Sequence, residues 1–336
     1  ISHPESSFLY MLGKEAIWRI NKKSEQSERI LERKGGYFLS ASATKKGLWV
    51  SNAFELMYIE QGEVKDQVDF RQYGRFIFNI HRDNAGNIWI GQEAANGIKR
   101  YNVHNKQIEV FDQENGLNNQ ITTITESETG LYVSILDNED YLFYKPEESD
   151  NFINISHPYK SEFGSFYIED LKILDEDIYM GTNMGLFRHS KDTLEKITFN
   201  SALESSIIRS IAIDSPFIWF GNQLGLYRYN VKTGMYNLFN EDTGLPANTV
   251  NQEGLLITEN KIWVGTPFGL SVMPYENRVY NKTKSPVILK ILVNGKERKH
   301  LNSELILQHN PYLEFFYTAL SFPASEIQYS YRIPEF

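Results

Sequence analysis

The chain has 336 residues, of which 41% are hydrophobic and 14% aromatic, and it carries a formal net charge of −9 with no cysteine. This length and apolar content are enough for a large core and for more than one domain. The lack of cysteine excludes disulfides, thiolate chemistry and cysteine-ligated zinc, and the negative charge argues against a general binder of nucleic acid or of anionic membranes.

The first residues show no signal-peptide pattern, so we expect the natural polypeptide to begin earlier. The sequence has no run of eighteen apolar residues, and no membrane-spanning helix is expected within it. Residues 1–8 lack the strand that should precede the first aromatic strand, so the first unit of the fold is expected to be incomplete. The charged stretch 19–30 is interpreted as an exposed outer strand and loop.

A short aromatic hairpin recurs along the chain, and its clearest copy is residues 218–230, where Gly221 and Gly225 bound a tight turn. One hairpin cannot bury its apolar face alone, which explains why it is repeated. The copies have aromatic anchors at steps of 39 to 47 residues, namely Tyr10, Trp49, Trp89, Tyr132, Tyr179, Trp219 and Trp263. This spacing is typical of four-stranded propeller blades, so seven anchors predict an all-β chain with a seven-bladed β-propeller.

Two loops support this periodicity. Residues 83–87 (Asp-Asn-Ala-Gly-Asn) have the composition of a hairpin turn, and they lack the further ligands of a calcium loop. The crossing at residues 115–119 recurs at 243–248 with the same Gly-Leu pair, three predicted blades later.

The run from Asn79 to Gly91, with the Gly-Leu crossings and the strand 225–230, resembles the two-component regulator propeller repeat. The similarity extends from about residue 5 to about residue 280. Such repeats form the periplasmic sensor regions of hybrid two-component sensor kinases, best known in Bacteroides-type gut bacteria. The resemblance therefore implies a sensor region whose kinase domains lie outside this chain.

The tail after the repeats has a different composition. Ser285-Pro286 is expected to end the propeller, which gives a propeller at 1–284 and a second domain at 285–336. Strands are expected at 287–293, before an Asn294-Gly295 turn, and at 312–320 and 329–333. This tail resembles the opening half of the triple-tyrosine (Y_Y_Y) domain, an immunoglobulin-like β-sandwich, so we expect a truncated sandwich.

Catalytic patterns are absent from the sequence. The seven histidines are scattered without metal-ligand spacing, and the carboxylate clusters at 137–140, 147–148 and 175–177 fall between predicted strands. No nucleophile elbow or dinucleotide fingerprint occurs. We therefore expect no catalytic residue, no metal and no cofactor, and a propeller glycan lyase or hydrolase remains an alternative.

One face of the predicted propeller is the expected ligand site, because the turns between second and third strands and the crossings between blades open on the same side. Amides and an arginine beside apolar side chains can hydrogen-bond sugar hydroxyls and stack on sugar rings. The alternative is that these amides have only a structural role and close the turns. The candidate residues are Glu93, Asn96, Asn118, Asn119, Asn183, Arg209, Gln223 and Asn248.

The resemblance implies a periplasmic region that detects an oligosaccharide derived from a polysaccharide and relays its binding through the sandwich to a kinase. It also implies a homodimer in the full-length sensor, attached to the membrane through a segment outside this chain. A propeller scaffold for a protein partner is the second hypothesis. An apolar patch of several hundred Å² on the candidate face would favour the scaffold.

Overall fold

The computed structural model describes residues 1–95, 97–137, 139–157, 166–191, 193–199, 206–274, 287–298 and 312–318. The chain divides into two compact units, Ile1–Pro274 and Tyr275–Phe336. The described residues form β-strands and two short 3₁₀ helices, and no α-helix occurs among them. The expected all-β class is therefore correct.

The described residues of the first unit form seven small antiparallel sheets, which we number in chain order. Sheet 1 has β1 (Phe8–Leu12), β2 (Ala16–Asn21) and β3 (Ser27–Glu32). Sheet 2 has β4 (Ser40–Ala43), β5 (Gly47–Ser51), β6 (Glu55–Glu60) and β7 (Glu63–Asp69). Sheet 3 has β8 (Ile77–Arg82), β9 (Ile88–Gln92), β10 (Ile98–Tyr101) and β11 (Ile108–Phe111).

The remaining sheets follow the same up-and-down order. Sheet 4 has β12 (Ile121–Ser127), β13 (Gly130–Ile135), β14 (Leu142–Pro146) and β15 (Ile153–Asn154). Sheet 5 has β16 (Ile168–Leu174), β17 (Asp177–Thr182), β18 (Gly185–His189) and β19 (Leu194–Lys196). Sheet 6 has β20 (Ser210–Asp214), β21 (Phe217–Gly221), β22 (Leu226–Asn230) and β23 (Tyr236–Phe239), and sheet 7 has β24 (Leu255–Thr258), β25 (Lys261–Thr266) and β26 (Gly269–Pro274).

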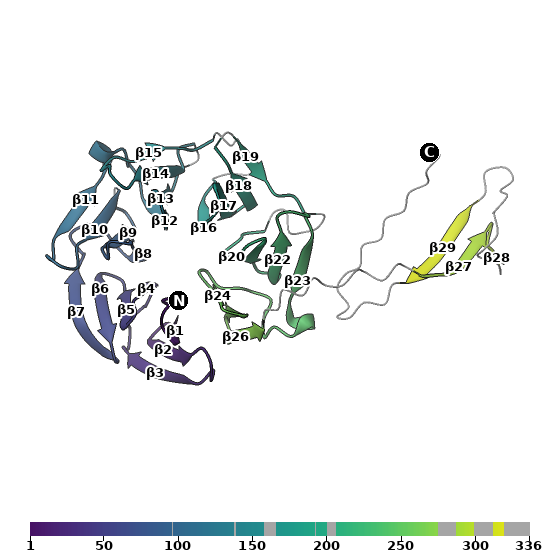
Figure 1. Ribbon diagram of the computed structural model, residues 1–336, viewed down its shortest axis with the longest axis horizontal. Coiled ribbons are helices and arrows are strands. Elements are labelled where there is room, and N and C mark those ends of the chain that lie inside the picture. The colour runs from purple at the N-terminus through teal and green to yellow at the C-terminus, as the bar shows by residue number, and fades with distance from the viewer. Residues whose placement is uncertain are drawn as a thin grey trace. The chain divides into compact units, whose positions relative to one another are not determined.

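Within this unit the sheets follow one another around a ring (Figure 1). The first strands of sheets 2 to 7 contact one another in succession along the inside of the ring. Sheet 7 packs against sheet 1 through Leu9, Ile20 and Trp263, and Lys261 forms an ion pair with Glu25 at 2.5 Å. The fold is therefore β-propeller-like, with the last sheet against the first.

The aromatic anchors lie where the periodicity places them. In sheets 2 to 7 the anchor is on the second strand, from Trp49 on β5 to Trp263 on β25. In sheet 1, Tyr10 is on β1. The sequence predicts no strand before β1, and in its place residues 1 and 2 make isolated backbone contacts with β1. Ser2 forms a β-bridge with Leu9, and the Tyr10 N–H donates to the Ile1 carbonyl at 2.8 Å.

Cores form between neighbouring sheets, as the repeat argument requires. Trp49 and Leu56 of sheet 2 pack with Ile80 and Ile90 of sheet 3, and all four side chains are at most 6% exposed. Similar clusters join sheet 3 to sheet 4 and sheet 5 to sheet 6. Each sheet thus covers the apolar face that the next one exposes.

The two predicted crossings share one geometry. The 3₁₀ helices η1 (Gln113–Asn115) and η3 (Glu241–Thr243) both carry a capping box and both end on a glycine with positive φ, Gly116 at 92° and Gly244 at 106°. In the hairpin turn at 83–87, Asp83 accepts hydrogen bonds from Asn87 and from the Trp89 indole at 2.9 Å. Its carboxylate therefore stabilises the turn and the anchor.

The described residues of the second unit, taken by itself, form a three-stranded antiparallel sheet of β27 (Val287–Val293), β28 (Lys296–Arg298) and β29 (Leu313–Thr318), in the order β28-β27-β29. The expected Asn294-Gly295 turn joins β27 to β28, with positive φ at both residues. The boundary expected at 284/285 and the strand expected at 329–333 lie outside the described residues.

Candidate functional site

The described candidate residues lie in the turns between second and third strands or in the crossings of the ring. Glu93 follows β9, Asn183 joins β17 to β18, and Gln223 joins β21 to β22. Asn118, Asn119 and Asn248 are in the two crossings, and Arg209 directly precedes β20. Asn96 lies outside the described residues.

Three of the amides hold loops in place. Asn119 donates to the Leu136 carbonyl at 2.7 Å, the Asn183 carbonyl oxygen accepts from the Tyr167 N–H at 3.1 Å, and the Asn248 oxygen accepts from the Glu241 N–H at 2.8 Å. Asn118 and Gln223 are exposed, and Glu93 is half-buried. The expected residues thus divide into turn-closing amides and exposed side chains.

The ring brings the candidates together in small groups, each between two neighbouring sheets. The Glu93 loop meets the Asn118 crossing through a parallel bridge between Gly97 and Gln120. The turn containing Gln223 meets the crossing of Asn248, because the Val250 N–H donates to the Asn222 carbonyl at 2.9 Å. Asn183 and Arg209 belong to a third group, between sheets 5 and 6.

That third group has the richest chemistry on the face. Arg209 is close enough to influence the ionisation of both Tyr167 and Glu169, and these two side chains influence the ionisation of each other. Burial raises the pKa of the Glu169 carboxyl, and the Arg209 charge opposes this rise. A guanidinium, a carboxyl, a phenol and an amide side by side can donate and accept hydrogen bonds to several hydroxyls of one ligand.

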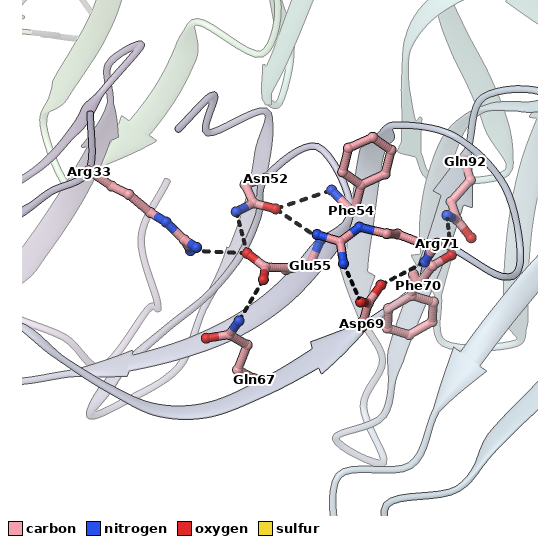
Figure 2. A network of polar contacts seen from close by, with 9 residues as sticks. All are labelled: Arg33, Asn52, Phe54, Glu55, Gln67, Asp69, Phe70, Arg71 and Gln92. Carbon is pink, nitrogen blue, oxygen red and sulfur yellow. Dashed lines mark hydrogen bonds and ion pairs between the residues drawn. The ribbon is translucent and has the colours of Figure 1, made fainter. Parts of the chain in front are cut away.

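A polar network fixes the rim of the same face in sheet 2 (Figure 2). Asn52 closes the β5–β6 turn by accepting from the N–H groups of Phe54 and Glu55 at 3.1 and 2.9 Å. The Glu55 carboxylate accepts from Asn52 and from Gln67, at 2.8 and 2.6 Å, and pairs with Arg33 at 3.0 Å. Because these polar groups form hydrogen bonds and an ion pair with one another, the network holds the β5–β6 turn in place.

Apolar side chains are also exposed on this face. Phe268 in the β25–β26 turn is 80% exposed, and Leu136, Leu224 and Phe76 are 45%, 36% and 45% exposed. Phe76 stacks on Phe54, with ring centroids 5.6 Å apart. The face therefore combines exposed apolar side chains with the polar group at Arg209.

A second polar set, which the sequence analysis missed, lines the inner strands. In sheets 2 to 6, a buried polar residue stands at the start of the first strand, or directly after an irregularity in its pairing with the second strand. Each of these residues is at most 7% exposed. Several of them bond the next sheet: the Ile80 N–H donates to Ser40 at 3.2 Å, and the Leu255 N–H donates to Ser210 at 3.2 Å. The set is Ser40, Asn79, Thr123, Asp170 and Ser210. Their spacing of 39 to 47 residues was the signal available in the sequence.

Glu253 connects this set across the ring. Asn79 of sheet 3 donates to its carboxylate at 3.2 Å, and Asp170 and Lys172 of sheet 5 influence its ionisation. Although the residue as a whole is exposed, desolvation of its carboxyl, with the charge of Asp170 acting in the same direction, raises the pKa of Glu253 to about 7. The Asn79 Oδ1 is buried without a hydrogen-bond partner in the described structure. Glu253 also lines a cavity of about 450 Å³ formed by sheets 1, 2 and 7.

Within the described ranges, no group of three or more His, Asp or Glu side chains could hold a metal ion. His157 and His189 stack with ring centroids 4.5 Å apart and bond to the carbonyls of Ser190 and Ile155, at 3.0 and 2.7 Å. These two histidines have structural partners. The part of the chain that the structure describes contains no helix long and apolar enough to cross a membrane.

The comparisons with known proteins place the fold. No protein-family model matches the chain. "Histidine kinase P4" of Formosa agariphila is 32% identical over 152 residues, which is 42% of this chain and 11% of that protein. The chain thus spans about a tenth of the length of this curated relative.

Solved structures share the fold over most of the chain. The extracellular domain of the putative hybrid two-component system BT4673 of B. thetaiotaomicron matches with a TM-score of 0.64 at 18% identity, over 82% of this chain and 39% of that one. PorZ, a surface component of the type-IX secretion system of Porphyromonas gingivalis, matches with a TM-score of 0.61 at 16% identity, over 82% of this chain and 46% of that one. The neighbours thus include the extracellular domain of a putative hybrid two-component system, in agreement with the resemblance found in the sequence.

Proposed function

We propose that this chain is the ligand-sensing region of a hybrid two-component sensor kinase and that it lies in the periplasm. The observation that carries the proposal is the ring of seven sheets, which resembles the extracellular domain of such a system, together with the stretch related to a histidine kinase. In this proposal each sheet is one blade of a seven-bladed propeller, and residues 285–336 begin an immunoglobulin-like sandwich of the Y_Y_Y type. The chain itself is not catalytic.

The proposed ligand is an oligosaccharide derived from a polysaccharide, bound on the face of the second-to-third turns. The support is the group of Arg209, Glu169, Tyr167 and Asn183, which offers donors and acceptors suited to hydroxyls. Signalling requires that the ligand bind one arrangement of the receptor more tightly than another, because only differential affinity shifts an equilibrium. In the full-length protein, a dimer attached to the membrane would transmit that shift.

Calorimetric titration of the chain with a panel of oligosaccharides tests the proposal. At least one member of the panel should bind without being cleaved, and Arg209→Gln should weaken its binding about tenfold or more, since a hydrogen bond to a charged group is lost. Lys232→Gln, the same charge change at an exposed lysine in the β22–β23 turn, at the opposite end of sheet 6 from this face, is the matched control. Turnover of any panel member by the chain would refute the proposal.

A protein-interaction scaffold is the second candidate function, and the exposed Phe268, Leu224, Leu136 and Phe76 favour it. A contiguous apolar patch is typical of a surface that binds another protein, and Phe268 has the most exposed apolar side chain of these four. Phe268→Ser distinguishes the two functions, because it should abolish binding of a protein partner while leaving oligosaccharide binding at Arg209 unchanged.

A further inference from the structure

A cavity of about 570 Å³ lies between sheets 2 and 3, away from the face described above. It is bordered by the β4–β5 loop, the β8–β9 turn and the β10–β11 turn. In an up-and-down antiparallel sheet, the turns after the first and third strands lie at the opposite end from the turn after the second strand. The cavity therefore opens on the side of the ring opposite to the proposed oligosaccharide face.

The lining of this cavity is basic. Five lysine and arginine side chains and two histidines line it against one carboxylate, Asp66, in a chain whose net charge is −9. The cationic lining residues are Lys45, Lys46, Lys65, Arg82 and Lys106. Such a local excess of positive charge attracts anions in spite of the negative charge of the whole protein.

Three of the five cations already have carboxylate partners. Lys45 pairs with Glu5 at 2.9 Å, Lys65 pairs with Glu63, and Lys106 pairs with Asp66. For the other two, Lys46 and Arg82, the described residues provide no ion pair. The Arg82 guanidinium lies over the β8–β9 turn, where a Cβ added to Gly86 would meet its Nη2 at 3.1 Å. Two unpaired cations therefore face one cavity from neighbouring sheets.

The cavity also has an aromatic wall. Trp49 and Tyr58 line it with ring centroids 5.1 Å apart, and the Tyr58 hydroxyl is 3.3 Å from the Thr44 hydroxyl. Aromatic rings beside hydroxyl groups suit a ligand with both a C–H face and hydroxyls. An inorganic anion alone would not use this wall.

We propose that this cavity binds a sugar bearing a carboxylate or a sulfate, with Lys46 and Arg82 holding the negative group and Tyr58 contacting the ring. The saccharide part of this inference rests on the proposed function, whereas the anion site rests on the cavity alone. Arg82 presents a planar donor pair to the anion, and Lys46 adds a mobile charge. In this proposal the cavity binds negatively charged sugars, and the opposite face of the ring binds neutral sugar units.

Titration calorimetry at low salt with D-glucose, D-glucuronate, D-glucose 6-sulfate and sodium sulfate tests this inference. Glucuronate and glucose 6-sulfate should bind at least about tenfold more tightly than glucose, and Arg82→Gln and Lys46→Gln should each remove about tenfold of that affinity. Lys34→Gln should have no effect, and the melting temperatures of all variants should confirm that they fold. Raising the ionic strength should weaken binding of both anionic sugars.

The outcomes separate this inference from the proposed function. Equal affinity for glucose and glucuronate, or unchanged binding of both anionic sugars in Arg82→Gln, overturns the anion site. Binding of sodium sulfate alone, lost in Arg82→Gln, supports the anion site and overturns its saccharide specificity. Binding of a neutral oligosaccharide that depends on Arg209 and not on Arg82 supports the proposed function. If no anionic sugar binds in the same experiment, this cavity is refuted as a ligand site.

Discussion

Asp170 is the position at which the inner strands are most strongly connected, and its replacement should destabilise the ring. The carboxylate is 4% exposed and accepts hydrogen bonds from the Leu171 N–H at 2.8 Å and from the Ile211 N–H of the next sheet at 2.7 Å. Asp170→Ala leaves both buried N–H groups without a partner, and each costs about 1–3 kcal/mol. Lys172, which also pairs with Asp170, is 41% exposed and regains water at little cost. The expected loss is about 4 kcal/mol, or about 8 °C or more in melting temperature.

The chain provides its own control for this prediction. Ser40 and Ser210 occupy the equivalent position in sheets 2 and 6 and bond the N–H of the next inner strand. Asp170→Ser should therefore recover about half of the loss, because one acceptor returns. Glu148→Ala, at an exposed carboxylate, should change stability by less than about 0.5 kcal/mol. The assay is urea unfolding followed by tryptophan fluorescence. A stability of Asp170→Ala within about 1 kcal/mol of wild type, or no difference between the serine and alanine variants, would refute the reasoning.

Three further predictions concern stability. Trp219→Ala removes a side chain that is 2% exposed and should cost about 3–5 kcal/mol in urea unfolding. Gly225→Ala places a Cβ 2.4 Å from the Phe239 carbonyl oxygen at a φ of +149°, so it should lower the free energy of unfolding by about 3 kcal/mol or more. Its control is Gly234→Ala, at φ +71° with open space around it, which should cost about 1 kcal/mol in the same assay. Glu253 has its pKa raised from 4.5 to about 7, so the folded state binds more protons than the unfolded state and this contribution to stability falls as pH rises through that window. Glu253→Gln should reduce the stability difference between pH 5 and pH 8, and an unchanged difference would show that another group causes it.

The architecture was predictable because each hairpin must repeat its aromatic anchor in order to bury it. Trp49, Trp219 and Trp263 all lie on second strands, and the Asn294-Gly295 turn forms where the sequence places it. Such features depend on local conformation and on a fixed period, and both are visible in one sequence.

The partners of polar side chains were not predictable in the same way. Asn119 and Asn183 were predicted as ligand-binding amides, and the sequence alone does not show that each also makes a hydrogen bond to a second loop. Glu169 and Arg209 meet although forty residues separate them, and Lys46 and Arg82 line one cavity from different sheets. These groupings depend on the pairing of neighbouring sheets, which hydrophobic periodicity alone does not specify.

The most direct test of the central claim is the phosphorylation of the full-length protein in membranes as a function of added oligosaccharide. We predict that an oligosaccharide which binds this chain changes the level of phosphorylation, and that Arg209→Gln shifts the dose–response curve to about tenfold or higher concentration. Unchanged phosphorylation of the wild-type protein in the presence of the bound oligosaccharide, or cleavage of that oligosaccharide by this chain alone, would contradict the proposed sensing function.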